Sequence, residues 1–345
     1  MAVTIKDVSA KCGLSISTVS KAFNNYADIS LETRELVQRT AREIGYYPHA
    51  IARTLKTNRS YNLGVLFQEK RGTGLTHSFF ASVLDAFKSA GEKRGYDITF
   101  INHHIGWTGM TYLEHCRYRN VDGVCVVCAD FYAPEVIELV DSNLPVVTID
   151  HSFNNRSCVL SDNIGGLKLL VDAAYQKGHR KIAYVHGEKS SVTENRIIGF
   201  YRAMQEHGLN VNLDFVVEAL YDNPATSMQA VLNLMNRPDP PTCILLPDDH
   251  STLGALQAAK QLNLRVPEDL SLAGYDGIRL TQMLQPRLTT IEQDTKRIGA
   301  QAAEFLIDRI ENPRTAGSET ATIPVKLLEG ESMGICPVKA DAANS

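Results

Sequence analysis

The chain has 345 residues, of which 44% are hydrophobic and 21% charged, and its formal net charge is −4. This length suggests two or three domains, and a composition near the globular average excludes a disordered, collagen-like or disulfide-stapled chain. No run of residues approaches the ~18 consecutive apolar residues of a membrane span. The N-terminus has Lys6, Asp7 and Lys11 where a secretory signal needs an apolar stretch. We therefore expect a soluble, cytoplasmic protein that contacts no membrane.

The net charge is unevenly distributed along the chain. Residues 1–60 contain nine basic and five acidic side chains, a net charge of +4, which leaves −8 for the remaining 285 residues. A basic head on an acidic body is typical of a protein whose small first domain binds a polyanion such as nucleic acid. The alternative at this point is a chance excess of basic residues on a solvated face.

The seven cysteines indicate a reducing compartment, because their number is odd and they form no short secreted framework. Cys125 and Cys128 form a C-x-x-C inside a segment that looks like a buried strand, and no second pair follows at similar spacing, so we expect no metal. Gly72-Thr-Gly74 is only half of a dinucleotide fingerprint, and no P-loop, G-x-S-x-G or H-E-x-x-H motif is present. The sequence therefore indicates neither a cofactor nor an enzyme.

From Thr4 to Gly45 the spacing of apolar residues predicts three short helices. Ser15 and Ser30 are candidate N-caps of the second and third, and Gly13 and Gly45 end the first and third. The residues expected to face inward are Ile5, Val8, Cys12, Val19, Ala22, Phe23, Leu36, Val37, Thr40 and Ile44. Two short helices joined by a tight turn are a helix-turn-helix arrangement. Tyr46-Tyr47-Pro48 ends this unit.

Residues 49–56 contain good helix formers but are fewer than the ~12–15 that a stable isolated helix needs, and 57–60 form a polar linker. From Tyr61 onward, apolar β-branched runs alternate with amphipathic helices. The expected strands are 63–67, 98–101, 123–127, 146–149, 181–185, 215–217, 243–246 and 270–273, and the expected crossover helices include 79–94, 165–177 and 253–262. Continuous apolar runs favour parallel strands covered on both faces, here in two doubly wound halves with a ligand cleft between them.

The first of these segments resembles a known family. Thr4-Ile-Lys-Asp-Val-Ser-Ala-Lys-Cys-Gly-Leu-Ser-Ile-Ser-Thr-Val-Ser-Lys-Ala-Phe-Asn24 is similar to the helix-turn-helix of the lac repressor (LacI/GalR) family of bacterial transcription regulators, with conservative departures at Ser9, Cys12, Leu14 and Phe23. Farther along, 178–182, 248–254, 266–270, 274–276 and 288–293 stand where that family carries the signatures of its periplasmic-binding-protein-like core. Only the tail beyond about Pro337 lies outside the resemblance.

The resemblance implies a small all-α helix-turn-helix domain plus an α/β periplasmic-binding-protein-like core of two doubly wound parallel-sheet lobes. We expect the DNA-binding domain at 1–48, the hinge helix and linker at 49–60, the effector-binding core at 61–339 and a tail at 340–345. Within the core, the first lobe takes about 61–160 and 292–320, and the second takes about 161–291 and 321–339.

The resemblance also implies roles at DNA. Base contacts in the major groove fall to Ser15, Ile16, Ser17 and Lys21. Phosphate contacts fall to Thr4, Thr18, Ser20, Asn24, Ser30 and Thr33. In the hinge, Leu55 would insert between base steps of the minor groove, with Ala52 allowing close approach and Arg53 and Lys56 near phosphate.

Simpler alternatives stay open for these residues: core packing for Ile16, a phosphate contact for Lys21, and docking onto the core for Leu55. His49 stands where the family usually has Asn, which leaves the contacts at the start of the hinge open. Two hinge helices packed together would kink one site, so we expect a homodimer on a near-palindromic operator in double-stranded DNA.

Charged side chains mark the expected cleft. Asp150, Asp248 and Asp276 each follow a predicted strand, Arg196 heads a predicted helix, and the resemblance adds Tyr221 and Phe79 as aromatic faces. Carboxylates with an arginine favour the vicinal hydroxyls of a sugar over a phosphate. For a single Asp, a helix cap or a surface turn is the simpler role, and Asp248 differs from the Asn of many family members.

The sequence therefore predicts a DNA-binding transcriptional repressor of carbohydrate utilisation genes, gated by a small sugar-like effector. Within the family, a purine- or nucleoside-responsive regulator and a carbon-catabolite regulator with a phosphorylated protein corepressor are the alternatives. A solute-binding transport protein would share the fold from residue 61 onward, but it would need a signal peptide and would lack the first 60 residues.

Overall fold

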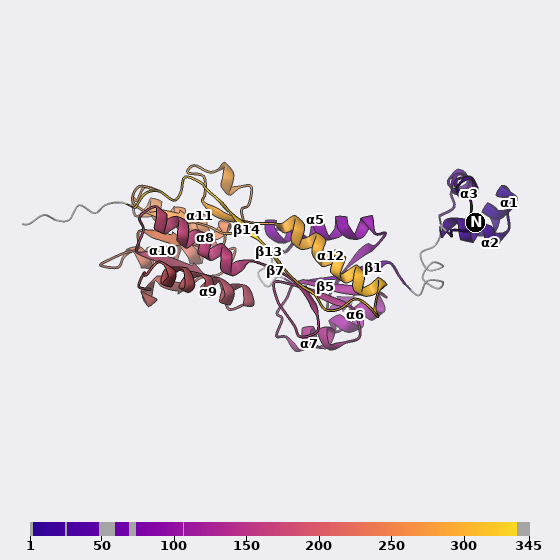
Figure 1. The fold of residues 1–345 in the computed structure, drawn as a ribbon, viewed down its shortest axis with the longest axis horizontal. Coiled ribbons are helices and arrows are strands. Elements are labelled where there is room, and N and C mark those ends of the chain that lie inside the picture. The colour runs from indigo at the N-terminus through magenta and orange to yellow at the C-terminus, as the bar shows by residue number, and fades with distance from the viewer. Residues whose placement is uncertain (1–2, 25, 48–58, 69–73, 106, 337–345) are drawn as a thin grey trace, which may run out of the picture.

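The computed structural model describes residues 3–24, 26–47, 59–68, 74–105 and 107–336 (Figure 1). Residues 3–47 form a helical head, and residues 59–336 form an α/β core. The predicted hinge residues Ala52, Arg53, Leu55 and Lys56, together with His49 and the tail 340–345, lie outside the described residues. Within the described ranges, no helix combines the length and the apolar character that a membrane crossing requires.

The helical head contains α1 (Ile5–Cys12), α2 (Ile16–Phe23) and α3 (Leu31–Ile44). The Ser15 and Ser30 hydroxyls accept hydrogen bonds from the backbone N–H groups of Thr18 at 3.0 Å and Thr33 at 3.2 Å, as predicted for N-caps. Gly13 ends α1 with φ +68°, a left-handed conformation that costs glycine no steric penalty. Local capping therefore sets the ends of these helices.

The core of the helical head consists of one buried cluster, whose members are Val8, Val19, Ala22, Val37, Ala41 and Tyr46. Leu36, expected to face inward, is half-buried and outside this cluster, because the inward face of α3 runs through Val37 and Ala41. Tyr46, expected only to end the unit, is 9% exposed, and its ring centroid lies 5.6 Å from that of Phe23. The core of the head thus extends two residues past the end of α3.

The first lobe of the core is built on a six-stranded parallel sheet in the order β13-β7-β6-β5-β1-β2. These strands are β1 (Asn62–Phe67), β2 (Asp97–Ile101), β5 (Gly123–Cys128), β6 (Val146–Ile149), β7 (Ser157–Ser161) and β13 (Thr320–Ile323). Helices α5 (Ser78–Lys93) and α12 (Thr295–Glu311) cover one face, and α6 (Tyr112–Tyr118) and α7 (Pro134–Asp141) cover the other. A short turn, η1 (Gly74–Thr76), and a ribbon of β3 (His104–Ile105) and β4 (Thr108–Gly109) complete this lobe.

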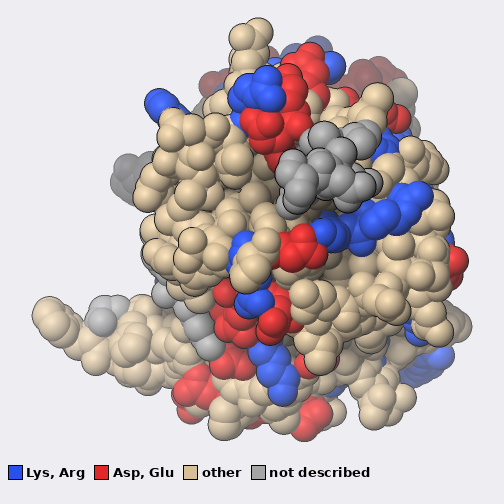
Figure 2. All heavy atoms as spheres, turned by 90° about the vertical axis from the view of Figure 1, so that its left-hand side faces the viewer, with Lys and Arg blue, Asp and Glu red and all other residues tan. Residues whose placement is uncertain are grey.

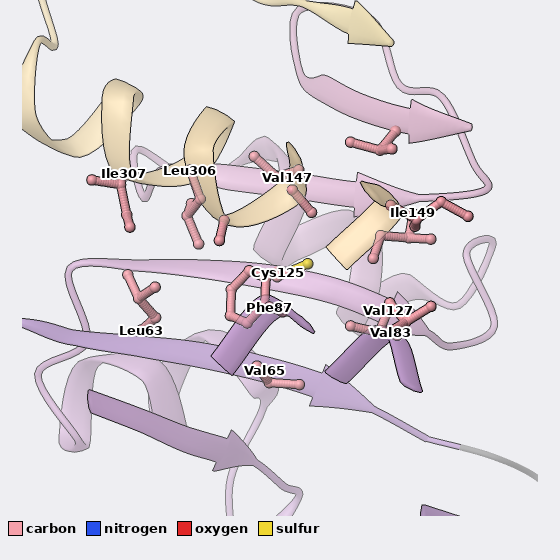
Figure 3. Packing of buried hydrophobic residues seen from close by; sticks show 14 of the residues in the cluster. Leu63, Val65, Val83, Phe87, Cys125, Val127, Val147, Ile149, Leu306 and Ile307 are labelled. Atoms are coloured by element: carbon pink, nitrogen blue, oxygen red, sulfur yellow. The ribbon is translucent and has the colours of Figure 1, made fainter. Parts of the chain in front are cut away.

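Alternate strand residues explain why both faces of this sheet are buried. Leu63 and Val65 of β1 point toward Phe87 of α5 and Leu306 of α12 (Figure 3), whereas Leu66 packs under α6 and α7. A strand that is apolar on both sides must be covered on both sides, as the continuous apolar runs predicted.

The second lobe has a four-stranded parallel sheet in the order β11-β10-β8-β9. The strands are β8 (Ile182–His186), β9 (Val216–Glu218), β10 (Cys243–Leu245) and β11 (Ser271–Ala273). Helices α8 (Asn163–Gln176) and α9 (Ser191–Glu206) pack on one face, and α10 (Pro224–Met235) and α11 (Asp249–Gln261) pack on the other. Two short turns, η2 (Leu213–Phe215) and η3 (Thr281–Met283), follow α9 and β11, and an antiparallel ribbon of β12 (Thr290–Gln293) and β14 (Val325–Leu328) lies against α8.

In the described part of the core, the chain passes between the lobes three times: after β7, after β12, and between β13 and β14. Asp162 and Asp294 follow the first two passages and cap α8 and α12 through the backbone N–H groups of Gly165 and Arg297. Pro324 alone separates β13 from β14. The six-stranded sheet therefore runs through Ser161 and Ile323, one and three residues past the expected limits of 160 and 320.

Candidate DNA-binding surface and ligand cavity

Three of the four residues predicted to read bases lie together at the start of α2. Ser15, Ile16 and Ser17 are exposed, and the Ile16 side chain is 45% exposed and outside the core cluster, which removes core packing as its role. Lys21 lies farther along α2, with Nζ 2.5 Å from Asp28 Oδ2, and this hydrogen bond raises the pKa of Lys21. Helix α2, capped by Ser15, therefore carries both the exposed apolar side chain of Ile16 and the charged amine of Lys21.

The residues predicted to contact phosphate stand at helix ends. Thr4 donates from both N and Oγ1 to Asp7 Oδ2 at 2.8 Å, Ser30 Oγ lies 2.9 Å from Thr33 Oγ1, and Asn24 Nδ2 donates to Ser20 O at 2.6 Å. Thr18 Oγ1 lies 2.8 Å from Ser15 Oγ in the first turn of α2. Thr4, Thr18, Ser30 and Thr33 stand at N-terminal turns, whose orphan N–H groups and partial positive charge suit an anion. Ser20 and Asn24 lie at the C-terminal end of α2 and gain nothing from this effect.

The outer end of the second lobe has a different surface. Figure 2 shows Lys and Arg side chains interspersed with Asp and Glu over the described residues of that face. Mixed charge of this kind gives no extended field of one sign, in contrast to the basic excess of residues 1–60.

A cavity of about 380 Å³ lies between the two lobes. Its walls come from the segments that follow parallel strands: Gln68 after β1, Cys128 at the end of β5, Asp150 after β6, and Glu188 after β8. Asp248 and Asp276 follow β10 and β11 of the second lobe. The structure thus brings together all six predicted cleft residues, Phe79, Asp150, Arg196, Tyr221, Asp248 and Asp276, in one cavity at the carboxyl ends of both sheets.

Asp150 and Asp276 face the cavity from opposite lobes. Asp150 Oδ1 accepts a hydrogen bond from the backbone N of Ser161 at 2.9 Å, and Asp276 Oδ1 accepts one from Gln293 Nε2 at 2.7 Å. Both residues have positive φ, +57° and +112°. Burial raises the pKa of both carboxyl groups above its ordinary value, because the surrounding protein disfavours their charged forms.

Arg196 on α9 is 4% exposed and joins several elements of the second lobe. Its Nε donates to Asn163 Oδ1 and its Nη1 donates to the carbonyl oxygen of Pro247, each at 2.7 Å. The guanidinium carbon lies 3.5 Å from the centroid of the Tyr275 ring, a cation–π contact. The guanidinium group is thus fixed in place at the cavity wall.

Asp248 is the N-cap of α11. Its carboxylate accepts hydrogen bonds from Ser251 N at 2.7 Å, from Ser251 Oγ at 2.8 Å and from Asp222 N at 2.8 Å. The simpler role considered for an isolated Asp therefore describes how this side chain is used, although it also lines the cavity.

The predicted aromatic residues differ in how they meet the cavity. Phe79 is buried in the core of the first lobe, with its ring centroid 5.2 Å from that of Phe80. Tyr221 places its hydroxyl 2.8 Å from Thr193 Oγ1 and covers Gly187, where an added Cβ would lie 1.9 Å from the ring. Gly187 is therefore required for Tyr221 to occupy this wall.

Other residues of the cavity wall were not predicted, and Gln293 and His151 are two of them. Gln293, at the end of β12, bonds to Asp276 as described. His151 stacks on Phe131, with ring centroids 4.5 Å apart and planes at 9°, and its Nδ1 lies 2.6 Å from Ser191 Oγ of the second lobe. Burial lowers the pKa of His151. The position of Gln293 at the end of the family-like segment 288–293 could have identified it, whereas no sequence signal pairs residues 151 and 191.

Comparison with known proteins agrees with this architecture. Residues 4–49 match the model of bacterial regulatory proteins of the lacI family, and residues 171–333 match that of a periplasmic binding protein-like domain. The chain is 31% identical over 344 residues to the HTH-type transcriptional repressor PurR of Pectobacterium atrosepticum, covering 97% of this chain and 98% of that protein. It is 33% identical over 324 residues to PurR of Vibrio vulnificus, covering 90% and 92%.

Solved structures share the fold. The lac repressor dimer bound to operator and the anti-inducer ONPF superposes with a TM-score of 0.78 at 24% identity, covering 97% of this chain and 100% of that one. The complex of the transcriptional regulator CelR with cellobiose gives a TM-score of 0.70 at 24% identity, covering 96% and 99%. The chain therefore belongs to the lacI family of bacterial regulatory proteins, a family of DNA-binding transcriptional repressors.

Proposed function

We propose that this repressor is gated by a small polyhydroxylated effector, a sugar, that binds in the cavity between the lobes. The carrying observation is the placement of Asp150 and Asp276 on opposite lobes of one cavity, with Gln293 and Arg196 beside Asp276. Carboxylate oxygens accept hydrogen bonds from vicinal hydroxyls, and they repel phosphate. A volume of about 380 Å³ is near the lower end of the ~300–1,000 Å³ typical of small-molecule sites, which favours a small ligand.

A ligand that touches both lobes favours one of their relative orientations. Asp150 would contact it from the first lobe and Asp276 from the second, across the three chain passages. By linkage, effector and operator must change each other's affinity by the same factor, and a coupling of about 2–3 kcal/mol corresponds to tens to a hundredfold. Whether the effector releases or recruits DNA depends on which orientation it favours.

The helical head supplies the operator contacts in this proposal. Ser15, Ile16, Ser17 and Lys21 read base edges in the major groove, and the helix-end residues Thr4, Thr18, Ser20, Asn24, Ser30 and Thr33 contact phosphate. A homodimer places two heads on a near-palindromic operator, with the hinge folding in the minor groove. The protein then acts in the cytoplasm, where the operator lies, and catalyses no reaction.

The direct test is to select an operator from a random DNA pool and measure its affinity by fluorescence anisotropy. We expect that affinity to fall steeply with salt. A thermal-shift screen of mono- and disaccharides, polyols and purines then identifies ligands, since a specific ligand raises stability by mass action. A sugar that raises the melting temperature and changes operator affinity at least tenfold supports the proposal. A panel in which no sugar does either contradicts it.

A purine effector is the second candidate, because relatives at 31–33% identity are named PurR. The same screen distinguishes a purine from a sugar effector. If a purine changes operator affinity and no sugar does, the cavity binds a planar base.

The hinge role of Leu55 has its own test. Leu55→Ala should keep the fold and lose tight operator binding, because an alanine cannot fill an opened base step. Leu75→Ala, at a 52% exposed position of η1, is the matched control and should bind operator normally. Operator affinity that is unchanged in Leu55→Ala would remove the minor-groove role.

A further inference from the structure

The cavity between the lobes is strongly acidic. Among the described residues that line it, carboxylate side chains outnumber basic ones six to two: Asp130, Asp150, Glu188, Asp222, Asp248 and Asp276 against Lys189 and Arg196. Lys189 is exposed at the mouth, so Arg196 is the buried cation of this wall. Such a cavity attracts cations and repels anions.

Several of these charges are used within the protein. Asp248 caps α11, Asp222 Oδ1 lies 2.6 Å from His250 Nδ1, and Glu188 Oε2 accepts a hydrogen bond from Tyr221 N at 2.9 Å. Arg196 is likewise engaged by Asn163 and the carbonyl of Pro247. These groups set the shape of the wall, and their charges are partly balanced locally.

Unlike these groups, the carboxylates of Asp150 and Asp276 are only partly engaged by the rest of the protein. Within the described part of the chain, neither carboxylate lies within 4 Å of a basic nitrogen, and the second oxygen of each receives no hydrogen bond. Gln293 lines the same cavity and is 5% exposed. Its Nε2 donates a hydrogen bond to Asp276, whereas its Oε1 is buried and has no hydrogen-bond partner among the described residues. The wall therefore presents acceptor oxygens with no donor to match them.

An acceptor set of this kind is costly to leave empty. The buried Gln293 Oε1 has lost its hydration without replacement, whereas Asp150 and Asp276 are half-buried in the cavity wall. Burial raises the pKa of both carboxyl groups, and the positive charge of Arg196 opposes this shift without a hydrogen bond to either one. A hydroxyl supplies one donor, whereas an ammonium group supplies three donors and a positive charge. The cation also satisfies the acidic excess of the cavity, which a neutral hydroxyl cannot do.

We propose that the effector is an amino sugar, or a related polyol with a free protonated amine, whose ammonium group binds among Asp150, Asp276 and the amide oxygen of Gln293. This inference rests on the proposed sugar-gated function and names the chemical class of its ligand. The remaining hydroxyls of the ring meet the rest of the wall.

The test is isothermal titration calorimetry of the full chain with matched ligands. Each set contains a free hexosamine, the hexose and the N-acetylhexosamine, in the gluco, galacto and manno series. In the series that binds, we expect the free amine to bind at least tenfold more tightly than both neutral partners. Asp276→Asn and Asp150→Asn should reduce this preference at least fivefold, whereas Asp172→Asn, at a carboxylate of α8 paired with His207, should keep it.

The ratio of wild-type affinities for the free hexosamine and its neutral partners tests the proposal even if a cavity variant folds poorly. Equal or tighter binding of the neutral hexose would overturn the amine inference and leave the sugar-gated function standing. If no member of this panel binds, and the thermal-shift screen finds only purines or no ligand, the proposed function and the amine inference are both contradicted.

Discussion

In the helical head, the side chains at the helix N-termini bond to residues three positions away, whereas several cavity side chains bond to residues much farther along the chain. Thr4 bonds to Asp7, Ser15 to Thr18 and Ser30 to Thr33, each three residues away. In the cavity, Asp150 bonds across 11 residues, Asp276 across 17 and Arg196 across 51. The DNA-binding surface therefore depends on local helix ends, and the cavity depends on the whole core being folded.

This difference implies that the two surfaces can fail separately. The head has its own buried cluster around Val19 and Val37, distinct from the clusters of the core. A substitution in one unit should therefore leave the intrinsic stability of the other unchanged. The predictions below test this separation, beginning with the largest expected effect.

Phe87→Ala should lower the free energy of unfolding of the core by about 3–5 kcal/mol, since the ring is fully buried between α5 and the six-stranded sheet. Differential scanning calorimetry of the full chain should show the core transition shifted down and the head transition unmoved. Val19→Ala is the reciprocal control and should shift the head transition alone. Joint movement of both transitions would show that the two units fold together.

Arg196→Met should abolish the response to effector while operator affinity without effector stays within about threefold of wild type. The variant removes the donors to Asn163 and Pro247, and each acceptor left without a donor costs about 1–3 kcal/mol. Effector affinity should fall at least a hundredfold in calorimetric titration. A normal effector response in anisotropy measurements would remove Arg196 from the cavity's function.

Asp249→Asn should change how stability depends on pH. The Asp249 carboxylate accepts hydrogen bonds from Thr290 Oγ1 at 2.6 Å and Ile278 N at 2.8 Å, and burial raises its pKa to about 7. In the unfolded chain the pKa of Asp249 is about 3.8, so between about pH 4 and 7 the native state binds a proton that the unfolded state has lost. The contribution of this group to stability is therefore full below about pH 4 and is lost as pH rises to about 7.

The expected slope is at most about 1.4 kcal/mol per pH unit in that window, and the Asn side chain should remove it. Urea unfolding at pH 5, 6, 7 and 8 should show the variant gaining on wild type up to pH 7 and levelling off above it. Asp294→Asn, an exposed cap of α12 where Asn caps equally well, should show a constant difference. Parallel pH profiles for wild type and Asp249→Asn would contradict the assignment.

Ser15→Ala should destabilise the head by about 1 kcal/mol, because α2 loses its N-cap, and it should weaken operator binding with effector binding unchanged. Ser15→Asn keeps a capping side chain and should restore the head's melting temperature. If operator affinity returns with it, Ser15 acts as a cap. If affinity stays low, the serine itself contacts the DNA.

Features that depend on neighbouring residues in the chain were the ones that could be predicted from the sequence. The helix ends at Gly13, Ser15, Ser30 and Gly45 follow from capping chemistry within one turn, and all eight strands expected from residue 61 onward are present as continuous apolar runs. Local propensity and periodicity fix these features without knowledge of the partner segment.

Features made by long-range pairing were missed. Strands β7 and β13 are short and partly polar, and they form only because Thr320 to Ile323 pair with Cys158 to Ser161. The bond of Gln293 to Asp276 and the contact of His151 with Ser191 each join segments that no spacing rule connects. Six cleft residues were nevertheless predicted, because strand ends of parallel sheets converge whatever their partners.

The passage at Pro324 has a consequence for protein synthesis. β13 completes the six-stranded sheet and β14 completes the ribbon of the second lobe, so the first lobe lacks a strand until residue 323, and the second until residue 328, has left the ribosome. At about 5–20 residues per second, the head is complete roughly 15–55 s before both lobes can close. A newborn chain can therefore present a folded DNA-binding head while it still has no cavity to sense a ligand, and chains truncated before residue 320 would be left in that unregulated state.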